Sequence, residues 1–144
     1  MASKPDIQLA TELRTVVGRL IKKLRKESVT GQQLSLTERS SMALLLQHKE
    51  LLPSELASME KITNQSMSQV LNHLLEVGYI NRKASETDKR KVIISLTELG
   101  ERTILQVRAE REEWLLKAIS ETCSEEEVLV LKQAIGPLTK LVDF

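Results

Sequence analysis

Residues 53–97 carry the feature that most constrains the fold: two helices joined by a very short turn and followed by a β-hairpin. Pro53 suits the first position of a short helix over 53–60. Thr63 is placed to cap a second helix, and Gly78 to end it. Alternating β-prone side chains then predict strands at 79–83 and 92–96, with a polar tip between them. This order predicts a winged helix-turn-helix.

Helical periodicity accounts for most of the remaining chain. A first helix begins near Pro5, and a second is capped either by Ser35, with Glu38 three residues on, or by Thr37. Thr97 is placed to cap a long helix over about 98–121, and Ser124 opens the last helix. The predicted fold class is mainly α: a winged helix-turn-helix with a small β-hairpin wing and long N- and C-terminal helices.

The two C-terminal helices carry more apolar residues than one chain can cover. The residues in excess lie outside the main apolar stripes of these helices or crowd them: Leu115, Ile119, Leu129, Val130, Leu141 and Val142. We therefore expect an obligate homodimer. Within each protomer, residues 1–144 are expected to form a single winged helix-turn-helix protein. Its predicted parts are the helix-turn-helix and wing over 37–97 and dimerisation helices over 5–27 and 98–142.

Composition excludes several classes of protein. One cysteine cannot form an internal disulfide, and one cysteine with two histidines is too few for an all-Cys/His zinc site. No apolar run is long enough to span a bilayer, and the N-terminus lacks an apolar signal core. No nucleophile–base pair or glycine-rich phosphate loop is visible. We expect a cytoplasmic protein that is not an enzyme, with no cofactor, no metal and no membrane partner.

The net charge of +1 hides a split between the two parts of the chain. Residues 1–91 contain 15 Lys and Arg against 10 Asp and Glu, whereas residues 92–144 contain 6 against 10. The basic part is the one that contains the predicted helix-turn-helix and wing. Such an asymmetry between two parts of a chain is more informative than its total charge.

Amide side chains line the helix that begins after Thr63. At 100° per residue, Gln65, Gln69 and Asn72 fall opposite the apolar stripe. Gln and Asn amides can pair with the edge of adenine in the major groove, where the second helix of a helix-turn-helix docks. A solvated polar face is the alternative reading of this helix taken alone. The candidate DNA-binding residues of the helix are Thr63, Asn64, Gln65, Ser66, Ser68, Gln69, Asn72 and His73.

The hairpin places five cations within ten residues: Arg82, Lys83, Lys89, Arg90 and Lys91. Cations at a hairpin tip can follow phosphates or enter the narrow minor groove, where the potential is most negative. A lone basic hairpin is more often a solubilising loop, but a basic wing directly after a helix-turn-helix is more specific. The candidate DNA-binding residues of the wing are Lys83, Lys89, Arg90 and Lys91.

The run from Asp88 to Gly100, DKRKVIISLTELG, resembles the wing signature of the MarR family of bacterial transcriptional regulators. Glu55-Leu56-Ala57 resembles the first helix of the family's helix-turn-helix. The segment from Leu74 to Arg82 resembles the end of its second helix and the start of its wing. The resemblance covers roughly residues 7–142. It implies an intertwined homodimer that binds palindromic double-stranded DNA and is often released by a small-molecule effector, a phenolic compound or an oxidant. It also implies that Arg90 is the wing-tip arginine and that Asp88 braces the wing by pairing with a nearby cation.

The chain departs from some members of that family. Its only cysteine, Cys123, lies at the end of the predicted long helix and not near the N-terminus, so peroxide sensing does not carry over. The function predicted from the sequence is a sequence-specific DNA-binding regulator, most simply a dimeric repressor. The alternative is a winged-helix module that binds protein and not DNA; the salt dependence of binding separates the two.

Overall fold

The structure is a computed structural model that describes residues 4–144. The elements, in chain order, are α1 (Lys4–Glu27), α2 (Leu36–His48), β1 (Glu50–Leu51), α3 (Pro53–Glu60), α4 (Asn64–Glu76), β2 (Ile80–Ala84), β3 (Val92–Leu96), α5 (Glu98–Thr122) and α6 (Glu125–Val142). The predicted fold class is confirmed: the chain is mainly helical, with one small antiparallel sheet.

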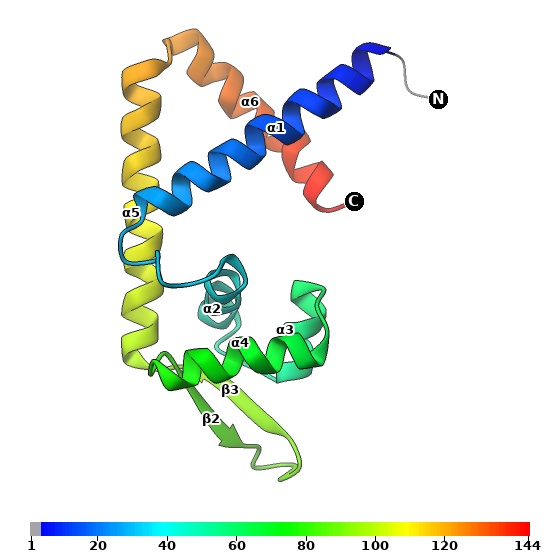
Figure 1. Ribbon diagram of the computed structural model, residues 1–144, viewed down its shortest axis with the longest axis vertical. Helices are drawn as coiled ribbons and strands as arrows, with labels where there is room; N and C mark the ends of the chain where they lie inside the picture. The colour runs from blue at the N-terminus through cyan, green and yellow to red at the C-terminus, as the bar shows by residue number, and fades with distance from the viewer. Residues whose placement is uncertain (1–3) are drawn as a thin grey trace.

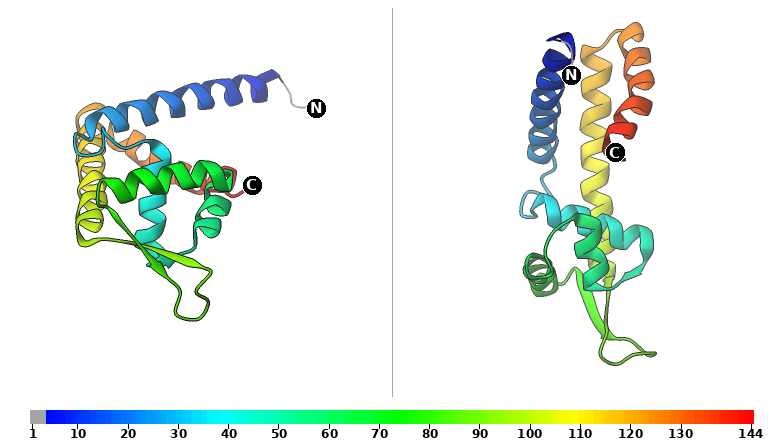
Figure 2. Two further views of the ribbon diagram at one scale, coloured as in Figure 1. Left: turned by 60° about the horizontal axis from the view of Figure 1, so that its bottom comes forward. Right: turned by 90° about the vertical axis from the view of Figure 1, so that its right-hand side faces the viewer.

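The long helix α5 joins two parts of the molecule (Figure 1). At one end of α5, the helices α2, α3 and α4 and the sheet form a lobe from which the β2–β3 hairpin projects (Figure 2). Around the other end, α1 and α6 lie on either side of α5 and extend away from it in the same general direction. The wing and the α1–α6 pair therefore occupy opposite ends of the molecule.

The core lies inside the lobe and is aliphatic. Met42 of α2, Leu56 of α3 and Met67 of α4 are fully buried. Ile94 of β3 and Ile104 of α5 close the same cluster. Because α5 contributes to this core, its N-terminal half is fixed to the lobe. Burial of each such side chain contributes roughly 1.5–3 kcal/mol.

The predicted helix starts are confirmed by their caps. Ser35, and not Thr37, caps α2, with Glu38 completing a capping box. Thr63 accepts a hydrogen bond from the Ser66 N–H at the start of α4. Ser124 forms a second capping box, with Glu127, at the start of α6. These caps satisfy N–H groups that a helix start leaves without partners.

The sheet contains one strand more than the sequence predicts. β1 is only two residues long and pairs with β3, so that the strand order is β1-β3-β2. β2 begins at Ile80, one residue later than predicted, because Tyr79 still closes the end of α4 through its N–H to Leu74 O at 2.9 Å. Gly78 makes this turn possible with φ of +83°, as its predicted role as a helix terminator requires.

The start of α5 is fastened to the turn after α4. The Thr97 hydroxyl donates to Gly78 O at 2.7 Å, and the Thr97 N–H donates to Tyr79 O at 3.0 Å. Gly100 packs so closely that an added Cβ would lie 2.0 Å from Tyr79 O. The Leu-Thr-x-x-Gly pattern therefore has a structural reason: Thr caps α5, and Gly lets the helix approach the backbone of Tyr79 in the turn between α4 and β2.

The helices α1 and α6 leave many of their apolar residues exposed. None of the residues of α6, and none of the α1 side chains that the structure describes, is fully buried. Val130, Ile135 and Val142 of α6 are 62%, 62% and 80% exposed. Ile7 and Val16 of α1 are 58% and 57% exposed.

Candidate nucleic-acid interface

The helix α4 presents different residues on its different sides. Its buried side consists of Met67, Leu71 and Leu74, as the periodicity predicts. Gln65 and Gln69 are exposed on the opposite side. Asn72 continues this amide line and is also exposed. The core thus fixes the orientation of α4 without using any of the three amides.

The first turn of α4 carries no acidic residue. Thr63 Oγ1 is used to cap the helix, and it also bonds the Ser66 hydroxyl at 3.0 Å. The Ser68 hydroxyl donates to Asn64 O within the helix at 3.0 Å. The uncompensated N–H groups and the positive end of the helix dipole make this turn attractive to phosphate.

A groove of about 350 Å³ lies between the start of α3, the first turns of α4 and the wing. Asn64 and Ser68 line one side of it, and Arg82, Arg90 and Lys91 supply three cations from the hairpin. Ser54, at the start of α3, completes the polar lining. The groove therefore combines hydroxyl and amide groups with concentrated positive charge.

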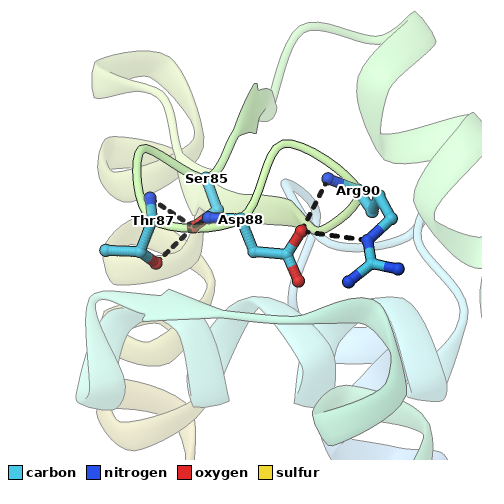
Figure 3. Close-up of polar contacts among 4 residues, drawn as sticks. All are labelled: Ser85, Thr87, Asp88 and Arg90. Carbon is cyan, nitrogen blue, oxygen red and sulfur yellow. Dashed lines mark hydrogen bonds and ion pairs between the residues drawn. The ribbon is translucent and has the colours of Figure 1, made fainter.

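The wing tip is organised around Asp88 (Figure 3). Asp88 Oδ1 accepts from the Arg90 backbone N–H at 3.1 Å and from Arg90 Nε at 3.3 Å. On the other side of the tip, the Ser85 hydroxyl accepts from the N–H groups of Thr87 and Asp88, both at 3.3 Å. The cation that Asp88 pairs with is thus Arg90 itself, whose side chain remains 92% exposed.

The other predicted wing cations are exposed. Lys83 and Arg82 are consecutive in β2 and therefore point to opposite faces of the hairpin. Since Arg82 lines the groove, Lys83 lies on the far face. Lys89 and Lys91 flank Arg90 at the tip, and the Lys91 N–H closes the turn to Asp88 O at 2.9 Å.

His73 differs from the other predicted residues of α4. Its Nδ1 contacts Oε2 of Glu38 on α2. The His73 side chain is exposed like the amide line, but this contact sets it apart from that line. Of the eight residues predicted on this helix, the structure places His73 on the side facing α2, and Asn64 and Ser68 on the side facing the wing.

Two residues of this surface were not among those predicted from the sequence. The sequence counts Arg82 among the basic residues of the hairpin, but only its place in the groove sets it beside α4. The sequence does not indicate Ser54 as a site residue, because Ser54 lies at a helix start that Pro53 alone explains. Both positions depend on β1 and β3 bringing the start of α3 against the hairpin.

Within residues 4–144, no three His, Cys, Asp or Glu side chains gather as a metal site would require. None of the helices in the same range combines enough length and apolarity to cross a membrane.

Comparisons with known proteins agree with this fold. Residues 34–92 match the MarR family. The chain is 30% identical over 138 residues to an uncharacterized HTH-type transcriptional regulator of Mycobacterium bovis, covering 96% of this chain and 95% of that one. A MarR family protein from Bacillus stearothermophilus has the same fold, with a TM-score of 0.83, 21% identity, and coverage of 100% of this chain and 99% of that one.

A mutant of Staphylococcus aureus MepR, solved bound to an oligodeoxyribonucleotide, also shares the fold. Its TM-score is 0.67 at 21% identity, covering 94% of this chain and 96% of that one. The chain therefore belongs to the MarR family and is a DNA-binding transcriptional regulator.

Proposed function

We propose that this regulator binds two-fold symmetric DNA as a homodimer and represses transcription from the site it occupies. The observation that carries the proposal is the surface shared by α4 and the wing: an open amide line beside a groove lined by three cations. An α-helix fits the major groove of B-DNA, and the wing is placed to follow the adjacent backbone.

In this arrangement Gln65 and Gln69 read base edges. Gln65 lies in the first turn of α4, which enters the groove first, and Gln69 follows one turn later. A bidentate amide–adenine pair discriminates against the wrong base by about 1–3 kcal/mol. Asn72 has a shorter side chain and lies further from the helix start, so we assign it a phosphate or water contact.

The groove and the wing would contact the DNA backbone, so they contribute to the affinity for DNA but not to the preference for particular bases. A DNA phosphate seated between Arg82 and Lys91 would meet the polar side chains of Ser54 and Asn64 as well. Arg90 projects from the wing tip toward the backbone or the minor groove, and Asp88 limits the directions it can take. Contacts of this kind position a protein on DNA and make its affinity depend steeply on salt.

The uncovered residues of α1 and α6 support dimerisation. Val130, Ile135 and Val142 would lie against water in a monomer, as would Ile7 and Val16 of α1. Large exposed apolar surfaces of this kind mark protein–protein interfaces. A dimer would cover them at the end of the molecule away from the wings, leaving both α4 helices free to bind one DNA site.

A crevice between α2, α3 and α5 is the proposed site of a small-molecule effector. Its volume is about 670 Å³, and Leu44, Met59 and Arg108 are among the residues that line it. Arg108 is the cation of this lining and Glu60 its carboxylate, so a phenolic compound such as salicylate would lie against the apolar side chains with its own carboxylate toward Arg108. Salicylate should weaken DNA binding by the parent protein but not by Ala43→Phe, which fills the crevice.

Since the proposed partner is chromosomal DNA, we place the protein in the cytoplasm and assign it no catalytic step. The test of the function is the binding of selected DNA, followed by fluorescence anisotropy at several salt concentrations. Steep salt dependence is expected for the parent, with Arg14→Ala on α1 as a control that leaves it unchanged. Binding that is indifferent to salt and to DNA sequence would contradict the proposal and favour a protein-docking module.

A further inference from the structure

The helix α4, the second helix of the helix-turn-helix and hereafter the recognition helix, contacts α2 through two titratable side chains. His73 lies in the last turn of α4, and Glu38 is in the first turn of α2. Oε2 of Glu38 contacts His73 Nδ1, while Oε1 accepts from the Ser35 N–H at 2.8 Å. The Glu38 side chain is 10% exposed, and that of His73 is 45% exposed. The contact therefore joins a nearly buried carboxylate to a ring that solvent can reach.

The environment of both groups favours their charged forms. The hydrogen bond to Glu38 and its negative charge raise the pKa of His73, and Glu76 of α4 acts in the same direction. Burial alone would raise the pKa of Glu38, but hydrogen bonds from the Ser35 backbone and from His73 outweigh it and lower that pKa. Among the described residues of α3 and β2, which also pack against α4, no charged group shifts the pKa of His73.

We propose that His73 is a positioning residue that links DNA binding to proton uptake, by fastening the last turn of the recognition helix to Glu38 when the ring is protonated. The inference rests on the proposed function, because it requires α4 to enter the major groove. The ring nitrogen nearest α2 is occupied by Glu38, so His73 acts on DNA through the placement of Gln69 and Asn72, not through a base contact of that nitrogen.

The sign of the effect follows from the raised pKa of His73. Below the ordinary pKa of histidine the ring is charged and the contact is at full strength. As the pH rises through the raised pKa, the ring loses its charge and the contact weakens to a neutral hydrogen bond. DNA affinity should therefore fall as the pH rises across this range.

The experiment measures the affinity for the selected DNA site from about pH 6 to 8 at constant ionic strength. The parent should lose affinity by about three- to tenfold across this range. In His73→Asn an amide can still donate to Glu38 but cannot become charged, so the pH profile should be flat, with the affinity that the parent shows at the high-pH end of the range. Glu38→Gln keeps the acceptor for Ser35, which protects the cap, and should also flatten the profile.

The chain offers a matched control, because His48 is its other histidine and lies exposed at the end of α2. His48→Asn should keep the pH dependence of the parent. In this background the imidazole proton signals seen by NMR belong to His73 alone. Adding Glu38→Gln should move the midpoint of that titration to lower pH, whether or not DNA is present.

The possible results separate the inference from the function on which it rests. Sequence-specific binding that does not depend on pH, or a full pH dependence kept in His73→Asn, would overturn the inference alone. If Glu38→Gln binds DNA more tightly and keeps the slope, His73 acts as a simple phosphate contact and the positioning role is wrong. A parent that binds no selected DNA at any pH would contradict the proposed function as well.

Discussion

Glu110 on α5 holds Thr30, in the connection between α1 and α2, by two hydrogen bonds. The Thr30 hydroxyl donates to Oε2 at 2.7 Å, and the Thr30 N–H donates to Oε1 at 3.1 Å. The hydroxyl of Ser28, which is fully buried, donates to the same carboxylate at 3.0 Å. Across the connection, the guanidinium of Arg39 donates to Gly31 O. The link between the α1 end and the DNA-binding lobe is thus fixed by side chains of α5 and α2.

We predict that Glu110→Gln destabilises the fold, because a neutral amide accepts these hydrogen bonds less strongly and matches them less well. The free energy of unfolding should fall by about 1–2 kcal/mol. Denaturant unfolding followed by circular dichroism measures this change. Glu113→Gln, at an exposed position on the same helix, is the control and should leave the midpoint unchanged.

The same carboxylate should make stability depend on acid. The hydrogen bond from the Thr30 hydroxyl is the largest cause that lowers the pKa of Glu110 from 4.5 to about 2. Since the folded pKa is lowered, the stabilisation is present above the unfolded value and is lost as the pH falls toward about 2. The stability difference between the parent and Glu110→Gln should therefore shrink between about pH 5 and pH 2. A constant difference would show that the charge of Glu110 does not matter.

Gly100→Ala should disrupt the junction between α5 and the wing. The added Cβ would lie 2.0 Å from Tyr79 O, a backbone atom that already accepts from Thr97. We expect a loss of at least about 2 kcal/mol in unfolding free energy. At Gly18 an added Cβ meets no atom of the described residues within 4 Å, so Gly18→Ala should be neutral or slightly stabilising. Thermal melts of the two variants compare them directly, and equal midpoints would contradict the close approach.

Arg90→Ala should weaken binding to all DNA sequences by similar factors. The side chain is 92% exposed, so folding should be unaffected, while each lost phosphate contact lowers the salt slope by about one per protomer. Asp88→Asn should also weaken binding, although it removes a negative charge near DNA, because a neutral amide oxygen accepts from the Arg90 guanidinium less strongly than a carboxylate does. Anisotropy titrations at several salt concentrations measure both. Tighter binding by Asp88→Asn would mean that Asp88 only repels phosphate.

Ile135→Asp should break the proposed dimer. Ile135 is 62% exposed in a single chain, so a charge there costs little in a monomer but a great deal in an apolar interface. Light scattering at micromolar concentration should report a dimer for the parent and smaller or unfolded species for the variant. Truncation after Cys123 should cost folding as well as association. A monodisperse monomer for the parent would contradict the dimer.

The sequence predicts the helices well because each carries its own local signals. Ser35 with Glu38, Thr63 and Ser124 mark helix starts by side chains that bond the next turn, and these signals need no distant partner. Gly78 marks a turn by its conformational freedom. Thus the winged helix-turn-helix order could be predicted before any three-dimensional arrangement was known.

Features that depend on distant residues could not be predicted. β1 is two residues long and exists only through pairing with Ile94 and Ser95 of β3. The contact between Glu38 and His73 joins residues 35 positions apart, and the sequence around either residue does not indicate the other as its partner. Similarly, periodicity places Arg82 on the hairpin, but the packing of α3 against the sheet creates the groove that Arg82 lines.

The central claim is that α4 reads DNA sequence on a two-fold symmetric site. Selection of bound sequences from randomised DNA tests it most directly, using the parent protein, Gln65→Ala, Gln69→Ala and Asn72→Ala. The parent should select a palindrome with half-sites about 10 base pairs apart. Each Gln variant should lose preference at one or two positions placed symmetrically in the half-sites, and Asn72→Ala should weaken binding without changing the preference. No enrichment by the parent, or unchanged preferences in both Gln variants with fold and dimer preserved, would contradict the account.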